Sequence, residues 1–188
     1  VMVISEVANT ESSSVTVLSG DVITIGGIQE VRDIQTALPN FSVFDANNTR
    51  IPKFSVRGLR ENNYGAGQSV IGMYVDGVPY TDMISRGLSL YDLDQIEFLR
   101  GPQGTRFGAG AAPGGVLNIK TRQPGLEWGG SAGLGFGEHN SQEYRFNSSG
   151  PLSEKIGVSI SGLYNDRDGY ITNMSTGSEI DSRETTAG

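Results

Sequence analysis

Residues 96–121 read IEFLRGPQGTRFGAGAAPGGVLNIKT, and the expected fold depends on this stretch. Its first residues predict an apolar strand, residues 100–115 are dense in Gly, and the alternation over 116–121 predicts a second strand. Glycine permits tight turns and the close approach of two backbones. A phosphate-binding loop needs a Lys directly after its glycines, whereas here the next Lys is Lys120, and Pro113 breaks the dinucleotide pattern G-x-G-x-x-G. The glycines therefore indicate a structural role and not a nucleotide site.

The composition excludes several classes of protein. The chain has 188 residues, no Cys, one His, 27 Gly and a formal net charge of -7. Without Cys there are no disulfides, thiolate zinc sites, iron–sulfur centres or thiol catalysts. The acidic balance disfavours a nucleic-acid partner. His139 lies in an expected turn, and neither a Gly-x-Ser-x-Gly motif nor the full calcium-loop pattern is present. We therefore expect no enzyme, no cofactor and no resident metal, although a ligand of the protein could be an iron chelate.

The sequence before residue 96 predicts short alternating elements. A strand is expected over 15–19, and helical spacing of apolar residues over 28–38 predicts a helix that Pro39 ends. Short strands are expected near 41–43 and 51–56. Two polar loops are expected over 60–69 and 81–90, on either side of a buried strand over 70–75 that ends at the turn Asp76-Gly77.

The pattern changes after Pro124-Gly125. From Trp128 onward, apolar and aromatic residues alternate with Gly, Ser and Asn in segments of about ten residues, which is typical of transmembrane β-strands. A short turn is expected over 150–155. A soluble β-sandwich also alternates, and the alternation alone leaves both readings open. We place the domain boundary between 1–124 and 125–188, and expect the sequence to be a piece of a longer chain.

Several motifs, taken in order, carry a resemblance to a known family. They are VRG at 56–58, YVDGVP at 74–79, IEFLRGPQGT at 96–105, FG at 107–108 and APGGVLNIKT at 112–121, with weaker matches at 15–19 and 38–43. Together they resemble the plug domain of TonB-dependent outer-membrane receptors over nearly all of residues 1–124. Gln95 and Arg106 depart from the usual pattern. The resemblance implies an α+β plug domain, a small mixed sheet with short helices, followed by the first antiparallel strands of a transmembrane β-barrel.

The resemblance also implies a function and partners. Such receptors import scarce solutes across the outer membrane of Gram-negative bacteria, and a ferric siderophore is the cargo we expect here. The plug gates the barrel lumen, and TonB on the periplasmic side captures an extended segment by strand addition. The other expected partners are outer-membrane lipid and a small-molecule ligand. A receptor that mainly signals and a soluble β-rich binding module are the alternative readings.

Site residues follow from the same resemblance. The segment Val1, Met2, Val3, Ile4 and Ser5 resembles the TonB box, although a plain first strand is the alternative. Arg57, Glu97 and Arg100 are assigned to a lock between plug and barrel, in which each Arg would pair with a barrel carboxylate. Capping of backbone carbonyls within the plug is the alternative for each Arg. The side chains assigned to ligand-facing loops, which could equally be solvated loop residues, are Tyr64, Gln68, Met83, Ile84 and Arg86.

Overall fold

The computed structural model describes residues 9–10, 13–45, 51–61, 69–82, 85–107, 112–168, 174–176 and 184–187. The chain divides into two compact units, Val1–Arg122 and Gln123–Gly188, which are called unit 1 and unit 2 below. The division falls two residues before the boundary expected after residue 124. Among the described residues, no helix has the length and hydropathy needed to cross a membrane.

Unit 1 contains a six-stranded mixed sheet in the order β1-β2-β8-β9-β6-β7. Strands β6 and β9 are parallel, and the other neighbours are antiparallel. A separate antiparallel sheet has the order β3-β4-β5. The bounds are β1 Asn9–Thr10, β2 Ser13–Ser19, β3 Phe41–Asp45, β4 Pro52–Val56, β5 Leu59–Arg60, β6 Ile71–Val75, β7 Val78–Pro79, β8 Leu93–Arg100 and β9 Gly115–Thr121.

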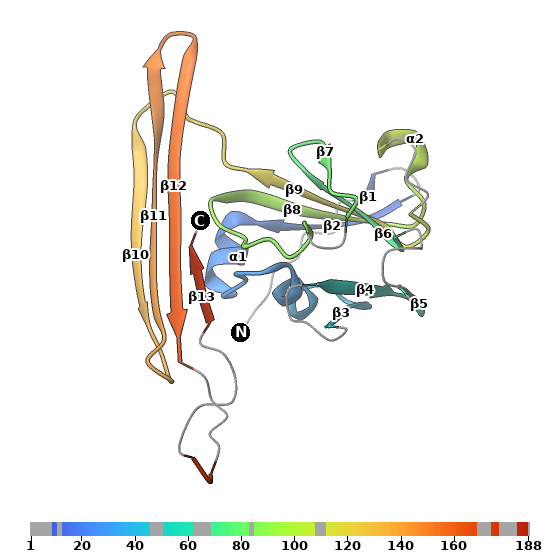
Figure 1. The fold of residues 1–188 in the computed structure, drawn as a ribbon. Coiled ribbons are helices and arrows are strands. Elements are labelled where there is room, and N and C mark those ends of the chain that lie inside the picture. The colour runs from blue at the N-terminus through green and yellow to red at the C-terminus, as the bar shows by residue number, and fades with distance from the viewer. Residues whose placement is uncertain are drawn as a thin grey trace. The chain divides into compact units, whose positions relative to one another are not determined.

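The core of unit 1 lies between its two sheets and its first helices. In Figure 1 the helix α1 (Gly20–Ile25) and the small sheet lie on the same side of the six-stranded sheet. Phe41 of β3 contacts Phe98 of β8 edge to face, with ring centroids 5.4 Å apart, and contacts Phe54 of β4 at 5.6 Å. These aromatic contacts join the two sheets. The largest fully buried side chains around them include Leu18, Ile34, Ile71, Met73, Ile96, Leu117 and Ile119.

The helices differ from the sequence prediction. The helix expected over 28–38 is a 3-10 helix, η1, at Val31–Thr36. It begins late because the Asp33 carboxylate accepts hydrogen bonds from the backbone N–H groups of Gln29 and Glu30, which holds those residues outside the helix. Helix α1 is not indicated by the sequence, since its residues 22–25 are β-branched and favour strands. A third helix, α2, is short and spans Gly104–Phe107.

Unit 2 is an antiparallel sheet in the order β10-β11-β12-β13. Its strands are β10 Gly129–Phe136, β11 Gln142–Ser153, β12 Ile156–Arg167 and β13 Glu184–Ala187. The alternating segments are therefore confirmed as strands. The turn expected over 150–155 is wrong in extent, because β11 continues to Ser153 and the turn is Glu154-Lys155. The strand accommodates Pro151 at an irregularity of register between Pro151 and Ser153.

Candidate functional site

Arg57 lies at the tip of a two-residue hairpin turn. Val56 of β4 pairs with Leu59 of β5, so the turn consists of Arg57 and Gly58, with φ of +49° and +83°. Positive φ at both central residues is the geometry of a tight hairpin turn that matches the twist of its strands. The backbone N–H of Arg57 donates to the carbonyl of Asn40 at 3.3 Å. The hairpin thus fixes the backbone at Arg57, while its side chain is exposed.

Arg100 ends β8 at a second tight bend. Gly101 has a φ of +86°, and its N–H donates to the carbonyl of Gly114 at 3.2 Å. The Arg100 side chain is half-buried: Nη1 donates to Oγ1 of Thr16 at 2.7 Å, and the guanidinium lies 5.2 Å from the centroid of the Phe98 ring. Burial, followed by repulsion from Arg57, lowers the pKa of Arg100 below its usual value.

The charge of Arg57 therefore acts on Arg100 in the folded unit, as the second cause of its lowered pKa. Arg57 lies in the turn between β4 and β5, whereas Arg100 ends β8 of the six-stranded sheet. Two like charges held near one another are stabilised by an anion that lies close to both. A guanidinium can also bind a carboxylate through two parallel hydrogen bonds. The arginine pair is therefore suited to receive a carboxylate from another part of the protein.

Glu97, which the sequence assigned to the lock with the two arginines, is engaged within unit 1. Its carboxylate accepts hydrogen bonds from Lys120 Nζ at 2.7 Å, Asn118 Nδ2 at 2.9 Å and Gln95 Nε2 at 2.7 Å. Burial alone raises the pKa of Glu97, but the hydrogen bonds from Lys120 and Asn118 and the nearby charges of Lys120 and Arg106 outweigh burial, so the pKa is lowered. The geometry therefore gives Glu97 a role in holding β8 to β9, and its assignment to the lock stays a prediction.

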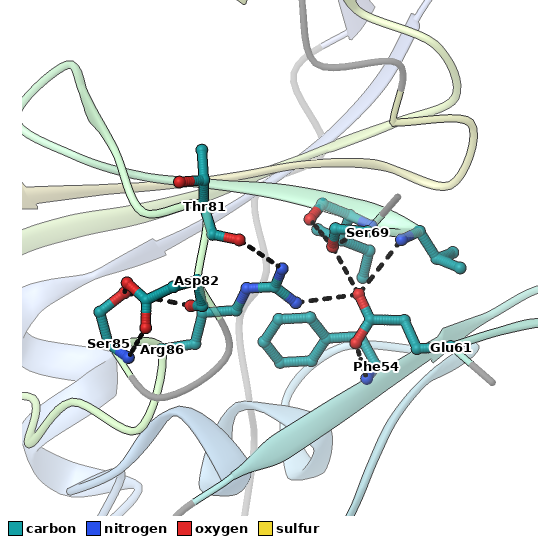
Figure 2. Close-up of polar contacts among 9 residues, drawn as sticks. Phe54, Glu61, Ser69, Thr81, Asp82, Ser85 and Arg86 are labelled. Atoms are coloured by element: carbon teal, nitrogen blue, oxygen red, sulfur yellow. Dashed lines mark hydrogen bonds and ion pairs between the residues drawn. The ribbon is translucent and has the colours of Figure 1, made fainter. Parts of the chain in front are cut away.

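Arg86 also departs from expectation. It was expected to face a ligand, yet its side chain is 3% exposed and forms an ion pair with the equally buried Glu61, with Nη1 2.9 Å from Oε1. Its Nη2 donates to the backbone carbonyl of Thr81 at 3.2 Å, and its guanidinium lies 5.6 Å from the centroid of the Phe54 ring. Figure 2 shows the Arg86 guanidinium directed at the Glu61 carboxylate and at the carbonyl of Thr81. The assignment of Arg86 to a ligand-facing surface is therefore corrected.

Glu61 is the residue of this cluster that the sequence did not indicate. Its Oε2 accepts from the backbone N–H of Phe54 at 3.1 Å, and its Oε1 accepts from the backbone N–H of Val70 at 3.1 Å and from the Ser69 hydroxyl. Phe54 belongs to β4 of the small sheet, whereas Val70 directly precedes β6 of the large sheet. One buried carboxylate thus connects the two sheets, as the dashed lines in Figure 2 show.

The remaining predicted site residues lie outside the described part of the chain. They are the TonB-box candidates Val1, Met2, Val3, Ile4 and Ser5, and the loop residues Tyr64, Gln68, Met83 and Ile84.

The sheet of unit 2 has one apolar and one polar face. Tyr144 of β11 lies opposite Leu134 of β10 and Tyr164 of β12, and Leu134 and Phe136 are 72% and 75% exposed. The other face carries the ion pair of Glu143 and Arg145 and hydrogen bonds between Asn147 and Ser131. Further exposed apolar side chains of unit 2 are Trp128, Phe146, Leu152, Ile156 and Ile160. A sheet of this kind needs an apolar surrounding on one face and water on the other.

The comparisons with known proteins agree with this geometry. The family model described as TonB-dependent Receptor Plug Domain matches residues 8–116, more than half of the chain. The pesticin receptor of Yersinia pestis is 32% identical over 178 residues, which cover 93% of this chain and 26% of that receptor. The iron-regulated outer membrane virulence protein of Vibrio cholerae serotype O1 is 26% identical over 182 residues, which cover 87% of this chain and 26% of that protein.

A solved structure extends the similarity to both units. The crystal structure of the ferric yersiniabactin uptake receptor FyuA from Yersinia pestis matches with a TM-score of 0.81 and 29% identity, over 94% of this chain and 28% of that one. The chain thus spans about a quarter of the length of the curated relatives it matches.

Proposed function

This chain belongs to the TonB-dependent receptor family, and we propose from that premise that the full-length protein imports a ferric siderophore across the outer membrane of a Gram-negative bacterium. The observation that carries the proposal is the similarity to the ferric yersiniabactin uptake receptor, which extends over 94% of this chain. Unit 1 is the plug that gates the lumen, and unit 2 supplies the first strands of the barrel.

The two faces of unit 2 support a location in the outer membrane. Its apolar face, which includes Leu134, Phe136 and Tyr144, meets lipid in this proposal, and its polar face, with Glu143 and Arg145, lines the watery lumen. The proposed activity is transport and not catalysis. Since the outer membrane has no nucleotide pool, the work comes from the inner membrane through TonB. TonB pairs with an extended N-terminal segment, for which residues 1–5 are the candidate.

An uptake assay tests this function. The full-length receptor is expressed in a Gram-negative host that lacks its own siderophore receptors, and cells are offered 55Fe–yersiniabactin, a 55Fe hydroxamate chelate or labelled cobalamin. We expect saturable uptake of a ferric chelate that is lost when TonB is deleted. Uptake of cobalamin alone would contradict the assigned cargo, and recovery of the receptor in the soluble fraction would contradict transport altogether.

A proline substitution tests the candidate TonB box. Val3→Pro removes a backbone donor that strand addition requires, so we expect uptake to be lost while ligand binding is retained. Uptake at the wild-type rate would show that TonB binds another segment.

The arginine pair is proposed as the lock that seats the plug. The charge of Arg57 acts on Arg100, and in this proposal carboxylates of the barrel wall neutralise both. Arg57→Ala or Arg100→Ala is expected to make cells more sensitive to small antibiotics at matched receptor levels, with the double variant more sensitive still. Arg→Lys at either position restores resistance in part, because Lys lacks the paired donors. Wild-type resistance in the double variant would assign both arginines to the internal structure of unit 1.

A further inference from the structure

The Glu61–Arg86 pair lies where the two sheets of unit 1 meet. The Glu61 carboxylate accepts one backbone N–H from β4 and another from Val70, immediately before β6. Arg86 fixes the segment that follows β7, because it donates to the carbonyl of Thr81 as well as to Glu61. The junction in Figure 2 is therefore made by one ion pair that contacts the chain at several separate places.

The pair is buried but not completely hydrogen-bonded. The side chains of Glu61 and Arg86 are 2% and 3% exposed. Within the described part of the chain, the buried Nε of Arg86 has no hydrogen-bond partner. Desolvation of two charges is costly, and their mutual attraction repays the cost only where geometry and hydrogen bonding are complete. The Glu61–Arg86 pair thus fixes how the two sheets are positioned, but it stabilises their contact less than apolar packing of similar volume would.

Separating the Glu61–Arg86 pair in water differs from separating two apolar surfaces. When two apolar surfaces separate, water gains contact with both of them, which is unfavourable. When Glu61 and Arg86 separate, each charge recovers its hydration, which offsets much of the attraction that is lost. An ion pair of this kind can hold two sheets in one arrangement and still separate at a lower cost than an apolar contact of similar size.

We propose that the Glu61–Arg86 pair is a releasable latch, at which the β3-β4-β5 sheet separates from the six-stranded sheet when the plug rearranges during transport. The inference rests on the proposed function, since it requires a plug that moves. The hydrophobic core, including Phe41, Phe54 and Phe98, also lies between the two sheets. The opening is therefore driven by external work, which TonB supplies in the proposed function.

Two buried valines report whether the junction opens. Val56, in β4, lies at the junction, because a Cβ placed on Gly114 would meet Val56 Cβ at 3.5 Å and Val70 Cγ1 at 2.8 Å. Val116, in β9, lies against Gly72 of β6, inside the six-stranded sheet. Both are buried, and these 188 residues contain no Cys. Val56→Cys is therefore the reporter of opening, and Val116→Cys is its matched control.

The first experiment measures maleimide labelling of each Cys variant in the full-length receptor in cells. With 55Fe–yersiniabactin, TonB and an energised inner membrane, we expect labelling of Val56→Cys to rise at least tenfold over de-energised cells, while Val116→Cys stays unlabelled. Continued protection of Val56→Cys during normal uptake would overturn the proposal. Equal labelling of both would also overturn it, because it would indicate unfolding or exit of the whole plug.

The second experiment replaces the latch with apolar side chains. We expect Glu61→Leu with Arg86→Met to retain ligand binding but to lower both uptake and the labelling of Val56→Cys at least tenfold, since the junction no longer gains hydration on opening. Arg32→Met, which removes the partly exposed pair of Arg32 with Glu30, is the control for charge removal. Wild-type uptake and labelling in the apolar variant would overturn the latch. If the variant fails to bind ligand, the wild-type labelling result decides.

A third measurement does not depend on transport. In purified full-length receptor, Glu61→Gln weakens the acceptor shared by Phe54 and Val70, so hydrogen exchange in peptides that contain these two amides is expected to rise together, at least tenfold, while β8 and β9 are unchanged. Unchanged exchange at Phe54 and Val70 would overturn the latch even if no ferric chelate is transported. Loss of uptake in the wild type, with coupled exchange intact, would instead contradict only the proposed function.

Discussion

Unit 1 and unit 2 are both rich in β-strands, but they place their apolar side chains oppositely. In unit 1, side chains such as Phe98 and Leu117 are fully buried between two sheets and the adjoining helices. In unit 2, Leu134, Phe136 and Ile160 remain largely exposed on one face of a single sheet. The difference shows that unit 1 supplies its own apolar environment, whereas unit 2 requires one from outside, which lipid provides in the proposed function.

Glycine also serves the two units differently. In unit 1, Gly115 permits a close backbone approach, because a Cβ there would lie 2.2 Å from the carbonyl oxygen of Leu99. In unit 2, Gly162 lies under the Phe146 ring and Gly150 under the Trp128 ring, where an added Cβ would come within 2.5 Å of ring atoms. An aromatic ring that packs over a glycine on a neighbouring strand stabilises a sheet that has no second layer of structure against it.

Hydrogen exchange should show the largest contrast between the units. In the 188-residue chain in water, we expect amides in β8 and β9 to exchange about 1,000-fold or more slowly than amides in β10–β12, because the former open only with the core. The isolated sheet of unit 2 lacks a covered apolar face and closed edges. Equal protection in both units would break the comparison.

Two matched Phe substitutions test the same difference between unit 1 and unit 2. Phe98→Ala is expected to lower the free energy of unfolding of unit 1 by about 3–5 kcal/mol, since the ring is fully buried in β8. Phe146→Ala, at a ring that is 53% exposed, should change that free energy by less than about 0.5 kcal/mol. Denaturant titration of each variant gives both values. A large effect of Phe146→Ala would mean that unit 2 contributes to the same core.

Matched Gly substitutions should have smaller effects. Gly115→Ala introduces a clash with Leu99 and a strained φ of +136°, so a loss of about 1–3 kcal/mol in the stability of unit 1 is expected. Gly129→Ala, where no atom lies within 4 Å of the added Cβ, should be close to neutral. The same titration measures both variants, and a neutral Gly115→Ala would refute the close approach of β8 and β9.

The smallest effect expected is a pH dependence confined to unit 1. The pKa of Glu97 is lowered by folding, so its contribution to stability is present above its usual value of 4.5 and is lost as the pH falls through the lower folded value. Glu97→Gln should therefore flatten the loss of stability below about pH 4.5 in acid titrations followed by circular dichroism. An unchanged acid profile would show that Glu97 does not link β8 to β9 energetically.

The sequence by itself determined the strands and the family. Alternation and β-branched runs indicated β2, β6, β9, β10, β11 and β12, because the alternation of side chains can be read from each segment on its own. Strand β13 (Glu184–Ala187) was not predicted. The turn at Asp76-Gly77 was also predicted, because Asp and Gly favour turns. The structure confirms it, with positive φ at both residues, +48° and +82°. Helix η1 was predicted too long, because the competing hydrogen bonds of Asp33 depend on side-chain geometry.

Tertiary structure alone decided which charges meet. In sequence, Arg57 and Arg100 are two arginines beside glycines, and only in the folded unit does the charge of Arg57 lower the pKa of Arg100. Likewise, nothing local distinguishes Glu61 from other acidic residues or shows that Arg86 is buried. The pairing of Glu61 with Arg86 depends on how the two sheets pack against each other. Composition and periodicity describe local sequence only, so they do not indicate which distant segments of the chain lie close together.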